Sequence, residues 1–201
     1  DRLIWRPFQL AFVLLTLCSA SSGTDPDREV MDLLWFPTGG GKTEAYLLLT
    51  AYVIFLRRLR AAGGPEGAGV TVFMRYTLRL LTIQQFQRAA AVILACDLLR
   101  RSPDLTGATQ LPGHFATDEP IAIGLWVGAD SVPNRLAEAI EDLTRESLGD
   151  QPASNPRRLS RCPQCNGLLN WAANDAKTDL QVTCRSAGCS LAGAPLPVVT
   201  V

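Results

Sequence analysis

Residues 36–43 constrain the fold of this 201-residue chain more than any other stretch. They read FPTGGGKT and lie between a short apolar run and a long apolar segment. Three successive glycines leave their backbone N–H groups unobstructed by Cβ atoms, and the lysine after them adds a positive charge. A loop of this kind between a strand and a helix binds phosphates, so we expect an α/β fold built around it.

Each residue type in the loop has its own task. Lys42 is expected to neutralise the β- and γ-phosphates of a nucleoside triphosphate, and the Thr43 hydroxyl to ligate Mg²⁺. The helix that begins there turns the positive end of its dipole toward the same phosphates. The general pattern, G-x-x-x-x-G-K-T, has a glycine where this chain has Phe36, and we expect that larger side chain to point into the core. A glycine-rich turn with an incidental lysine is the alternative, and it leaves the flanking strand and helix unexplained.

Apolar runs and helical segments alternate along the chain. Short β-branched or aromatic runs predict buried strands at residues 31–36, 70–76 and 121–128. Longer segments with apolar residues at helical spacing predict helices at residues 43–60, 81–101 and 132–147. Strands and helices in alternation imply a parallel sheet covered by helices on both faces. Trp35 and Trp126 lie in predicted strands, so both are expected in the core.

The N-terminal stretch has the early arginine, the apolar run and the small residues of a secretory signal. However, Gln9 opens the apolar run, and the run is too short to span a bilayer. We therefore expect residues 7–18 to form a buried helix that ends in a polar loop, and no membrane partner. Cys18 and Cys96 lie in apolar helical stretches and are expected in the core, whereas the sole histidine, His114, is expected to face solvent.

The segment PTGGGKTEAY resembles motif I of the superfamily 2 helicases, in which the first glycine of the general pattern is often absent. Upstream, residues 6–9 (RPFQ) resemble the adenine-reading segment of that family, because a glutamine amide both donates to and accepts from a purine edge. A polar residue at the start of a helix is the alternative for Gln9. Downstream, residues 75–86 resemble motif Ia in part, with Tyr76 where proline is usual, and the stretch GADSVPN resembles the next motif loosely.

Together with a cysteine-rich tail, these motifs are most similar to the large helicase of DISARM-type bacterial anti-phage systems. The resemblance implies a P-loop NTPase, RecA-like motor domain at residues 1–150, the first of two, which acts on DNA with ATP and Mg²⁺. Lys42 and Thr43 would be catalytic, and the residues assigned to ATP are Arg6, Phe8, Gln9, Pro37, Thr38, Gly39, Gly40, Gly41, Lys42, Thr43 and Glu44. The residues assigned to DNA are Thr77, Arg79, Gln84, Ser131 and Asn134, and a solvated helix face is the alternative for Arg79 and Gln84.

One element of such a motor is not found in the sequence. No apolar strand ends in Asp-Glu, the pair that holds Mg²⁺ and activates water. Asp118 and Glu119 precede a predicted strand and are followed by Pro120, so we interpret them as loop charge. We expect the pair, and a second motor domain with an arginine finger, after Val201. The expected partners are therefore DNA, further domains of the same chain, and proteins of a defence system.

Four cysteines near the end of the chain form a second motif. Cys162 and Cys165 give C-x2-C, and Cys184 and Cys189 give C-x4-C. Paired thiolates on two tight turns complete a tetrahedral Zn²⁺ site, and two disulfides in a secreted domain are the alternative. We expect zinc, because an ATP-dependent motor belongs in the reducing cytoplasm.

These cysteines predict a zinc-ribbon insert within residues 151–201, followed by a return to the motor domain. A ribbon of roughly residues 157–193 is too small for a sizeable core, which is when metals are recruited. The ribbon is either purely structural or contacts nucleic acid or a partner protein, since four arginines cluster there, namely Arg157, Arg158, Arg161 and Arg185.

The sequence therefore predicts a cytoplasmic, ATP-dependent DNA helicase or translocase. The formal net charge is +0, so no global basic field indicates nucleic acid or an anionic membrane. Two other classes stay open. One is a P-loop ATPase that acts as a switch or assembly factor, and the other is a zinc-ribbon nucleic-acid-binding module with regulatory nucleotide binding.

Overall fold

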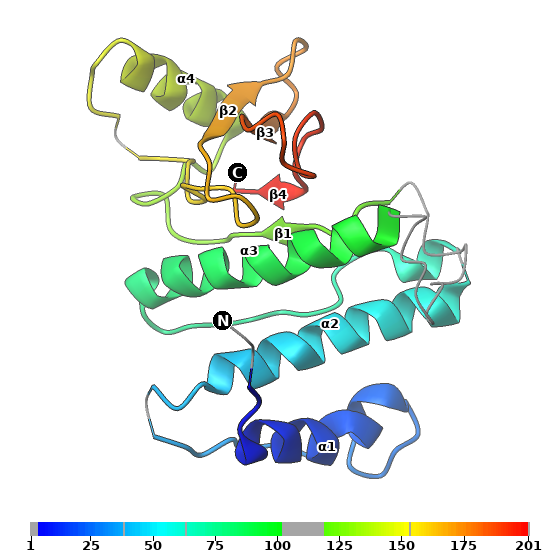
Figure 1. The fold of residues 1–201 in the computed structure, drawn as a ribbon. Coiled ribbons are helices and arrows are strands. Elements are labelled where there is room, and N and C mark those ends of the chain that lie inside the picture. The colour runs from blue at the N-terminus through cyan, green and yellow to red at the C-terminus, as the bar shows by residue number, and fades with distance from the viewer. Residues whose placement is uncertain (1–3, 38, 63, 102–118, 153, 201) are drawn as a thin grey trace. The chain divides into compact units, whose positions relative to one another are not determined.

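The computed structural model describes residues 4–37, 39–62, 64–101, 119–152 and 154–200 (Figure 1). These residues form two compact units, an N-terminal unit that ends at Met74 and a C-terminal unit that begins at Arg75. The predicted loop residues Thr38, His114 and Asp118 lie outside the described residues.

The N-terminal unit is helical. Helix α1 covers Pro7–Ser21, helix α2 covers Lys42–Ala61, and a 3₁₀ turn, η1, covers Pro65–Gly67. Helices α1 and α2 lie side by side (Figure 1), and the ring of Phe12 meets that of Tyr46 edge-on, with centroids 5.5 Å apart. Aromatic pairs favour this geometry because the positive ring edge meets the negative face. The two predicted helices are thus confirmed.

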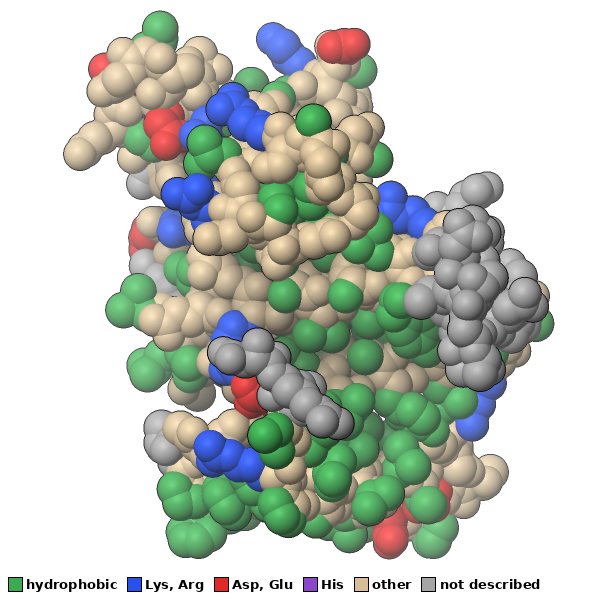
Figure 2. All heavy atoms as spheres, in the orientation of Figure 1, with side chains coloured by type: hydrophobic (Ala, Val, Ile, Leu, Met, Phe, Trp, Pro, Cys, Tyr) green, Lys and Arg blue, Asp and Glu red, His purple; other side chains and the backbone are tan. Residues whose placement is uncertain are grey.

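Helix α1 is less buried than its sequence predicts. Only Gln9 and Thr16 are buried, whereas the side chains of Leu14 and Leu15 are 69% and 72% exposed. Figure 2 shows the resulting apolar surface over α1, at the bottom of the view. Cys18 is likewise exposed and not in the core. Among the described residues, no helix combines the length and apolar character needed to cross a membrane.

Two of the three predicted strands are wrong for the described residues. Residues 31–36 and 70–76 form no ladder, and the side chains of Trp35 and Phe73 are 85% and 72% exposed. A strand is stabilised by hydrogen bonds and side-chain pairs with a neighbouring strand, and neither segment has such a neighbour among the residues that the structure describes. β-Branched composition alone therefore does not produce the strand.

The C-terminal unit contains helices and short strands. Helix α3 covers Arg79–Arg101 and helix α4 covers Leu136–Ser147, close to two predicted helices. Strand β1, Ile123–Gly124, pairs in parallel with β4, Val198–Val199. Strand β2, Leu169–Ala173, pairs antiparallel with β3, Leu180–Cys184.

The fold of the described residues is therefore mixed α/β with two small sheets. The third predicted strand shortens to β1, and Trp126 beyond its end is 88% exposed, not in the core as expected. The chain leaves the parallel pair at β1 and returns to it at β4, so α4 and the cysteine-containing segment form one long connection between parallel neighbours. A RecA-like sheet stays a prediction, as does the domain boundary at residue 150.

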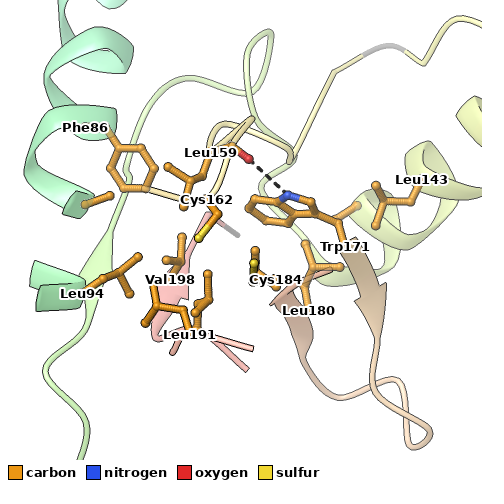
Figure 3. Close-up of a cluster of buried hydrophobic side chains, with 14 residues drawn as sticks. Phe86, Leu94, Leu143, Leu159, Cys162, Trp171, Leu180, Cys184, Leu191 and Val198 are labelled. Atoms are coloured by element: carbon orange, nitrogen blue, oxygen red, sulfur yellow. Dashed lines mark hydrogen bonds between the residues drawn. The ribbon is translucent and has the colours of Figure 1, made fainter. Parts of the chain in front are cut away.

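One hydrophobic core joins the helices of the C-terminal unit to the cysteine-containing segment (Figure 3). Helix α3 contributes Phe86 and Leu94, α4 contributes Leu143, and strands β2 and β3 contribute Trp171 and Val182. Two of the four clustered cysteines belong to the same core. The segment predicted as a ribbon therefore does not have a core of its own.

Candidate nucleotide loop and metal centre

The glycine-rich loop has a backbone that only glycine adopts readily. Gly39 has φ +81° and Gly41 has φ +90°, both in the left-handed region. Gly41 is also the N-cap of α2 and, as a glycine, supplies no side-chain cap to the helix. The first N–H groups of a helix lack backbone partners within it, so the start of α2 presents N–H donors and a positive dipole end to an anion.

Lys42 is the first residue of α2 and its ammonium lies over the loop. Its Nζ atom donates to the carbonyl of Phe36 at 2.5 Å and to that of Pro37 at 3.2 Å. The Gly40 N–H donates to the Pro37 carbonyl at 3.1 Å, which closes the turn. A phosphate in the loop would replace carbonyl oxygens as the partner of the ammonium, an exchange that favours the more negative acceptor.

Residues of the first turn of α1 hold the loop from outside. Gln9 is 4% exposed, and its Nε2 atom donates to the Gly41 carbonyl at 2.6 Å. Its Oε1 atom accepts the Arg6 backbone N–H at 2.8 Å, and the Arg6 side chain donates to the Gly40 carbonyl at 3.0 Å. The structure thus brings Arg6 and Gln9 to the loop. Adenine recognition by Gln9 stays a prediction.

Phe36 does not point into the core as expected. Its ring is stacked on that of Phe8, with centroids 3.8 Å apart and an interplanar angle of 13°, and its side chain is 39% exposed. A Cβ atom on Gly40 would lie 2.7 Å from Cδ1 of Phe36, so the ring also lies directly against the loop backbone. A Cβ on Gly41 would lie 3.2 Å from a carboxylate oxygen of Glu44, which places Glu44 at the loop, and Thr43 next to it is half-buried.

The residues assigned to DNA lie at two places in the C-terminal unit. Thr77, Arg79 and Gln84 lie at or before the first turns of α3, and Thr77 and Gln84 are exposed. Ser131 and Asn134 lie between β1 and α4; Asn134 is exposed, but Ser131 is 5% exposed. Contact with DNA is untested for all five and stays a prediction.

Arg158 connects helix α3 to the segment between β1 and α4. Its guanidinium donates to the Ser131 carbonyl, and its own carbonyl accepts from Nε2 of Gln87 on α3 at 3.2 Å. Sequence analysis grouped Arg158 with the arginines available to nucleic acid and missed this internal role. No local pattern signals it, because its partners are far away in the sequence.

The four predicted metal ligands come together. The sulfur atoms of Cys162, Cys165, Cys184 and Cys189 all lie within 4.8 Å of one another. Sγ of Cys162 is 3.7 Å from that of Cys189, and Sγ of Cys165 is 3.6 Å from that of Cys184. A disulfide requires about 2.05 Å, whereas a tetrahedron with Zn–S bonds of ~2.3 Å has edges of ~3.8 Å. The four thiols fit a tetrahedral zinc ion and do not fit the disulfide alternative.

Backbone donors support two of the four sulfurs in the same way. The Gly167 N–H donates to Sγ of Cys165 at 3.4 Å, and the Leu191 N–H donates to Sγ of Cys189 at 3.4 Å. In each case the donor lies two residues after the cysteine, on the turn that carries it. Such bonds orient metal ligands and stabilise their charged form.

The thiols differ in their tendency to ionise. Hydrogen bonds, first from the Ser186 hydroxyl and then from the Gly167 N–H, lower the pKa of Cys165 to about 6. Burial raises the pKa of Cys162. Outside the cluster, burial and then the charge of Asp97 raise the pKa of Cys96 to about 11, as expected for an inert core thiol.

One residue beside the cysteines was missed by sequence analysis. Oε1 of Gln164, within the first cysteine turn, accepts from Oγ of Ser190 at 2.6 Å and lies 3.7 Å from Sγ of Cys189. Gln164 therefore links the two cysteine turns at a point other than the metal. Its position between Cys162 and Cys165 is visible in the sequence, but its pairing with Ser190 depends on the fold.

The clustered arginines divide into two groups. Arg157 forms an ion pair with Glu146 at 3.3 Å, and Arg158 is held internally. The other two, Arg161 and Arg185, are exposed on either side of Leu168, which bridges to Arg161 and accepts the Arg185 backbone N–H at 3.1 Å. Within the described part of the chain, no ion pair involves Arg161 or Arg185.

Comparison with known proteins adds one relationship. No protein-family model matches the chain, and no solved structure matches it. A DISARM protein DrmA from Bacillus paralicheniformis is 35% identical over 214 residues. The match includes 100% of this chain but 18% of the relative, so the chain spans less than a fifth of that protein's length. The chain is thus homologous, along its whole length, to a segment of a DISARM protein DrmA.

Proposed function

We propose that this chain is the nucleotide-binding part of an ATP-dependent DNA helicase or translocase that takes part in bacterial phage defence. The observation that carries the proposal is the start of α2, where the N-cap Gly41 has φ +90° and the Lys42 ammonium lies over the loop carbonyls. Homology to a DISARM protein supports the defence role. Four cysteines that stay reduced are typical of the cytoplasm, the location that we propose.

In this proposal the loop binds the phosphates of ATP. Backbone N–H groups at the start of α2 and the Lys42 ammonium receive the negative charge, and the Thr43 hydroxyl is available to Mg²⁺. Bound ATP supplies the energy of phosphoryl transfer, which also needs an oriented water and further cationic groups. We assign these groups, including the Asp-Glu pair and a second motor domain, to parts of a DrmA-like protein that this segment does not span.

DNA would bind on the C-terminal unit. Gln84 on α3 and Asn134 before α4 are exposed, and Arg158 links α3 to the segment that contains Ser131. Arg161 and Arg185 add guanidinium groups with no ion pair among the described residues, and Arg suits phosphate contacts. Zinc, held by four thiolates, would stabilise this unit without taking part in chemistry, since all four ligand positions are protein sulfurs.

The test is ATP hydrolysis by the full-length protein with and without DNA. We expect DNA to stimulate turnover, and Lys42→Ala to abolish the stimulated rate while leaving the fold intact, because the change removes a charge at the surface and no packing. Undiminished turnover in Lys42→Ala would exclude the loop as the ATP site. An ATP hydrolysis rate that is the same with and without DNA would favour a switch or assembly ATPase. DNA binding without ATP hydrolysis would favour a zinc-ribbon binding module.

A further inference from the structure

The ring of Phe36 lies between two segments that are far apart in the sequence. One face stacks on Phe8 in the first turn of α1, with centroids 3.8 Å apart. The ring also abuts the loop, since Cδ1 would lie 2.7 Å from a Cβ on Gly40. Phe36 occupies the position at which the general phosphate-loop pattern has a glycine, so this contact is a property of this chain and not of the pattern.

Two hydrogen bonds accompany the stack. The Arg6 side chain donates to the Gly40 carbonyl at 3.0 Å, and the Gln9 side chain donates to the Gly41 carbonyl at 2.6 Å. In a planar trans peptide the C=O and the following N–H point in opposite directions. Arg6 and Gln9 therefore fix the direction of the Gly41 and Lys42 N–H groups, which point away from the first turn of α1.

Those N–H groups begin helix α2, where an anion would bind. Glycine is free to rotate, so without external contacts the peptides at Gly40 and Gly41 would sample other orientations. The two hydrogen bonds act only while the first turn of α1 stays against the loop. The Phe8–Phe36 stack is an apolar contact that helps to hold it there, in addition to the Phe12–Tyr46 pair between α1 and α2.

We propose that Phe36 is a positioning residue for nucleotide binding. Through its stack on Phe8 it holds Arg6 and Gln9 on the loop carbonyls, and so preorganises the N–H groups that receive phosphate. The proposal rests on the proposed function, because it needs a nucleotide at the loop. Phe36→Gly, which brings the sequence closer to the general pattern, weakens nucleotide binding instead of improving it.

The experiment measures dissociation constants for ATP and CTP with the full-length protein. Because the preorganised N–H groups receive the phosphates, which ATP and CTP share, Phe36→Gly should weaken the binding of both nucleotides, each roughly two- to tenfold. Phe36→Tyr keeps the stack and should bind like the unmodified protein. Phe36→Leu keeps apolar bulk against Gly40 but loses the stack, and should resemble Phe36→Gly while remaining folded.

Phe8→Leu supplies the matched test. Because Phe8 and Phe36 act through one contact, Phe8→Leu should weaken both nucleotides in the unmodified protein and add little in Phe36→Gly. Equal or tighter binding by both Phe36→Gly and Phe36→Leu, or full additivity with Phe8→Leu, would overturn the proposal. Lys42→Ala separates the two hypotheses. If it abolishes nucleotide binding while the Phe36 variants bind normally, only the positioning role fails; if it has no effect, the proposed function fails.

Discussion

Trp171 on β2 donates its indole N–H to the backbone carbonyl of Leu159 at 3.3 Å (Figure 3). Both residues are buried in the core that also contains Cys162 and Cys184. The hydrogen bond ties the hairpin to the segment that enters the first cysteine turn. The metal centre is therefore one side of a core whose other sides are α3 and α4, and the consequences of losing the metal should extend to those helices.

Removing the metal should loosen more than the cysteine turns. With a strong chelator, we expect amides of β2, β3 and the inner face of α3 near Phe86 to lose hydrogen-exchange protection together, because they share one core. Amides of α2 in the N-terminal unit should keep their protection. Protection that is lost only within residues 157–193, with α3 unchanged, would show that the ribbon is an independent module.

The identity of the ligands can be checked by metal content. Cys184→Ser should remove most of the zinc from protein purified under reducing conditions, because a serine hydroxyl is a poor substitute for a thiolate. Cys96→Ser is the matched control, since Cys96 is also buried but lies on α3 outside the cluster, and it should keep a full equivalent. Equal zinc content in the two variants, or disulfides among the four cysteines by mass spectrometry, would contradict the assignment.

The link between the two cysteine turns should affect the rate of metal release. In Gln164→Ala the turns lose the hydrogen bond to Ser190, so we expect zinc to transfer to a chelator several-fold faster, on the scale of about 1 kcal/mol for one hydrogen bond. Ser190→Ala removes the donor of the same hydrogen bond and should release zinc as fast as Gln164→Ala. Stopped-flow measurement with a chromogenic chelator gives the rates of zinc release. Identical rates for the unmodified protein and both variants would show that the Gln164–Ser190 hydrogen bond does not stabilise the metal site.

The helices and the four-cysteine cluster could be predicted, because each depends on residues close together in the sequence. The helices follow from apolar spacing within one segment, and the four-cysteine cluster follows from two short spacings that place pairs of thiols on single turns. The strands predicted at residues 31–36 and 70–76 are wrong for the described residues, because a strand depends on a neighbour that no local pattern identifies.

The same distinction separates the site residues. Gly39 and Gly41 have the left-handed backbone that a glycine-rich loop predicts, since that property belongs to the residue type itself. The orientation of Phe36 could not be predicted, because it depends on Phe8, which belongs to another helix. Arg158 shows the same limit, since its charge suggests a nucleic-acid contact and its carbonyl partner on Ser131 is visible only in the fold.

The closest test of the loop geometry is Gly41→Ala. Gly41 has φ +90°, and an added Cβ would lie 2.8 Å from Nε2 of Gln9, so the variant is strained by its backbone and by a clash with the side chain that holds the loop. We expect weaker ATP binding by about five- to thirtyfold, which corresponds to a cost of about 1–2 kcal/mol for a left-handed non-glycine residue.

Gly23→Ala is the matched control in the same unit, because a Cβ there meets nothing within 4 Å. It should bind ATP like the unmodified protein in an equilibrium titration. Gly41 lies at the surface end of α2 and not in the core. Gly41→Ala should therefore lose less free energy of unfolding, measured by its melting temperature, than free energy of ATP binding. Unchanged ATP affinity in Gly41→Ala would mean that the backbone at the start of α2 does not receive the phosphates.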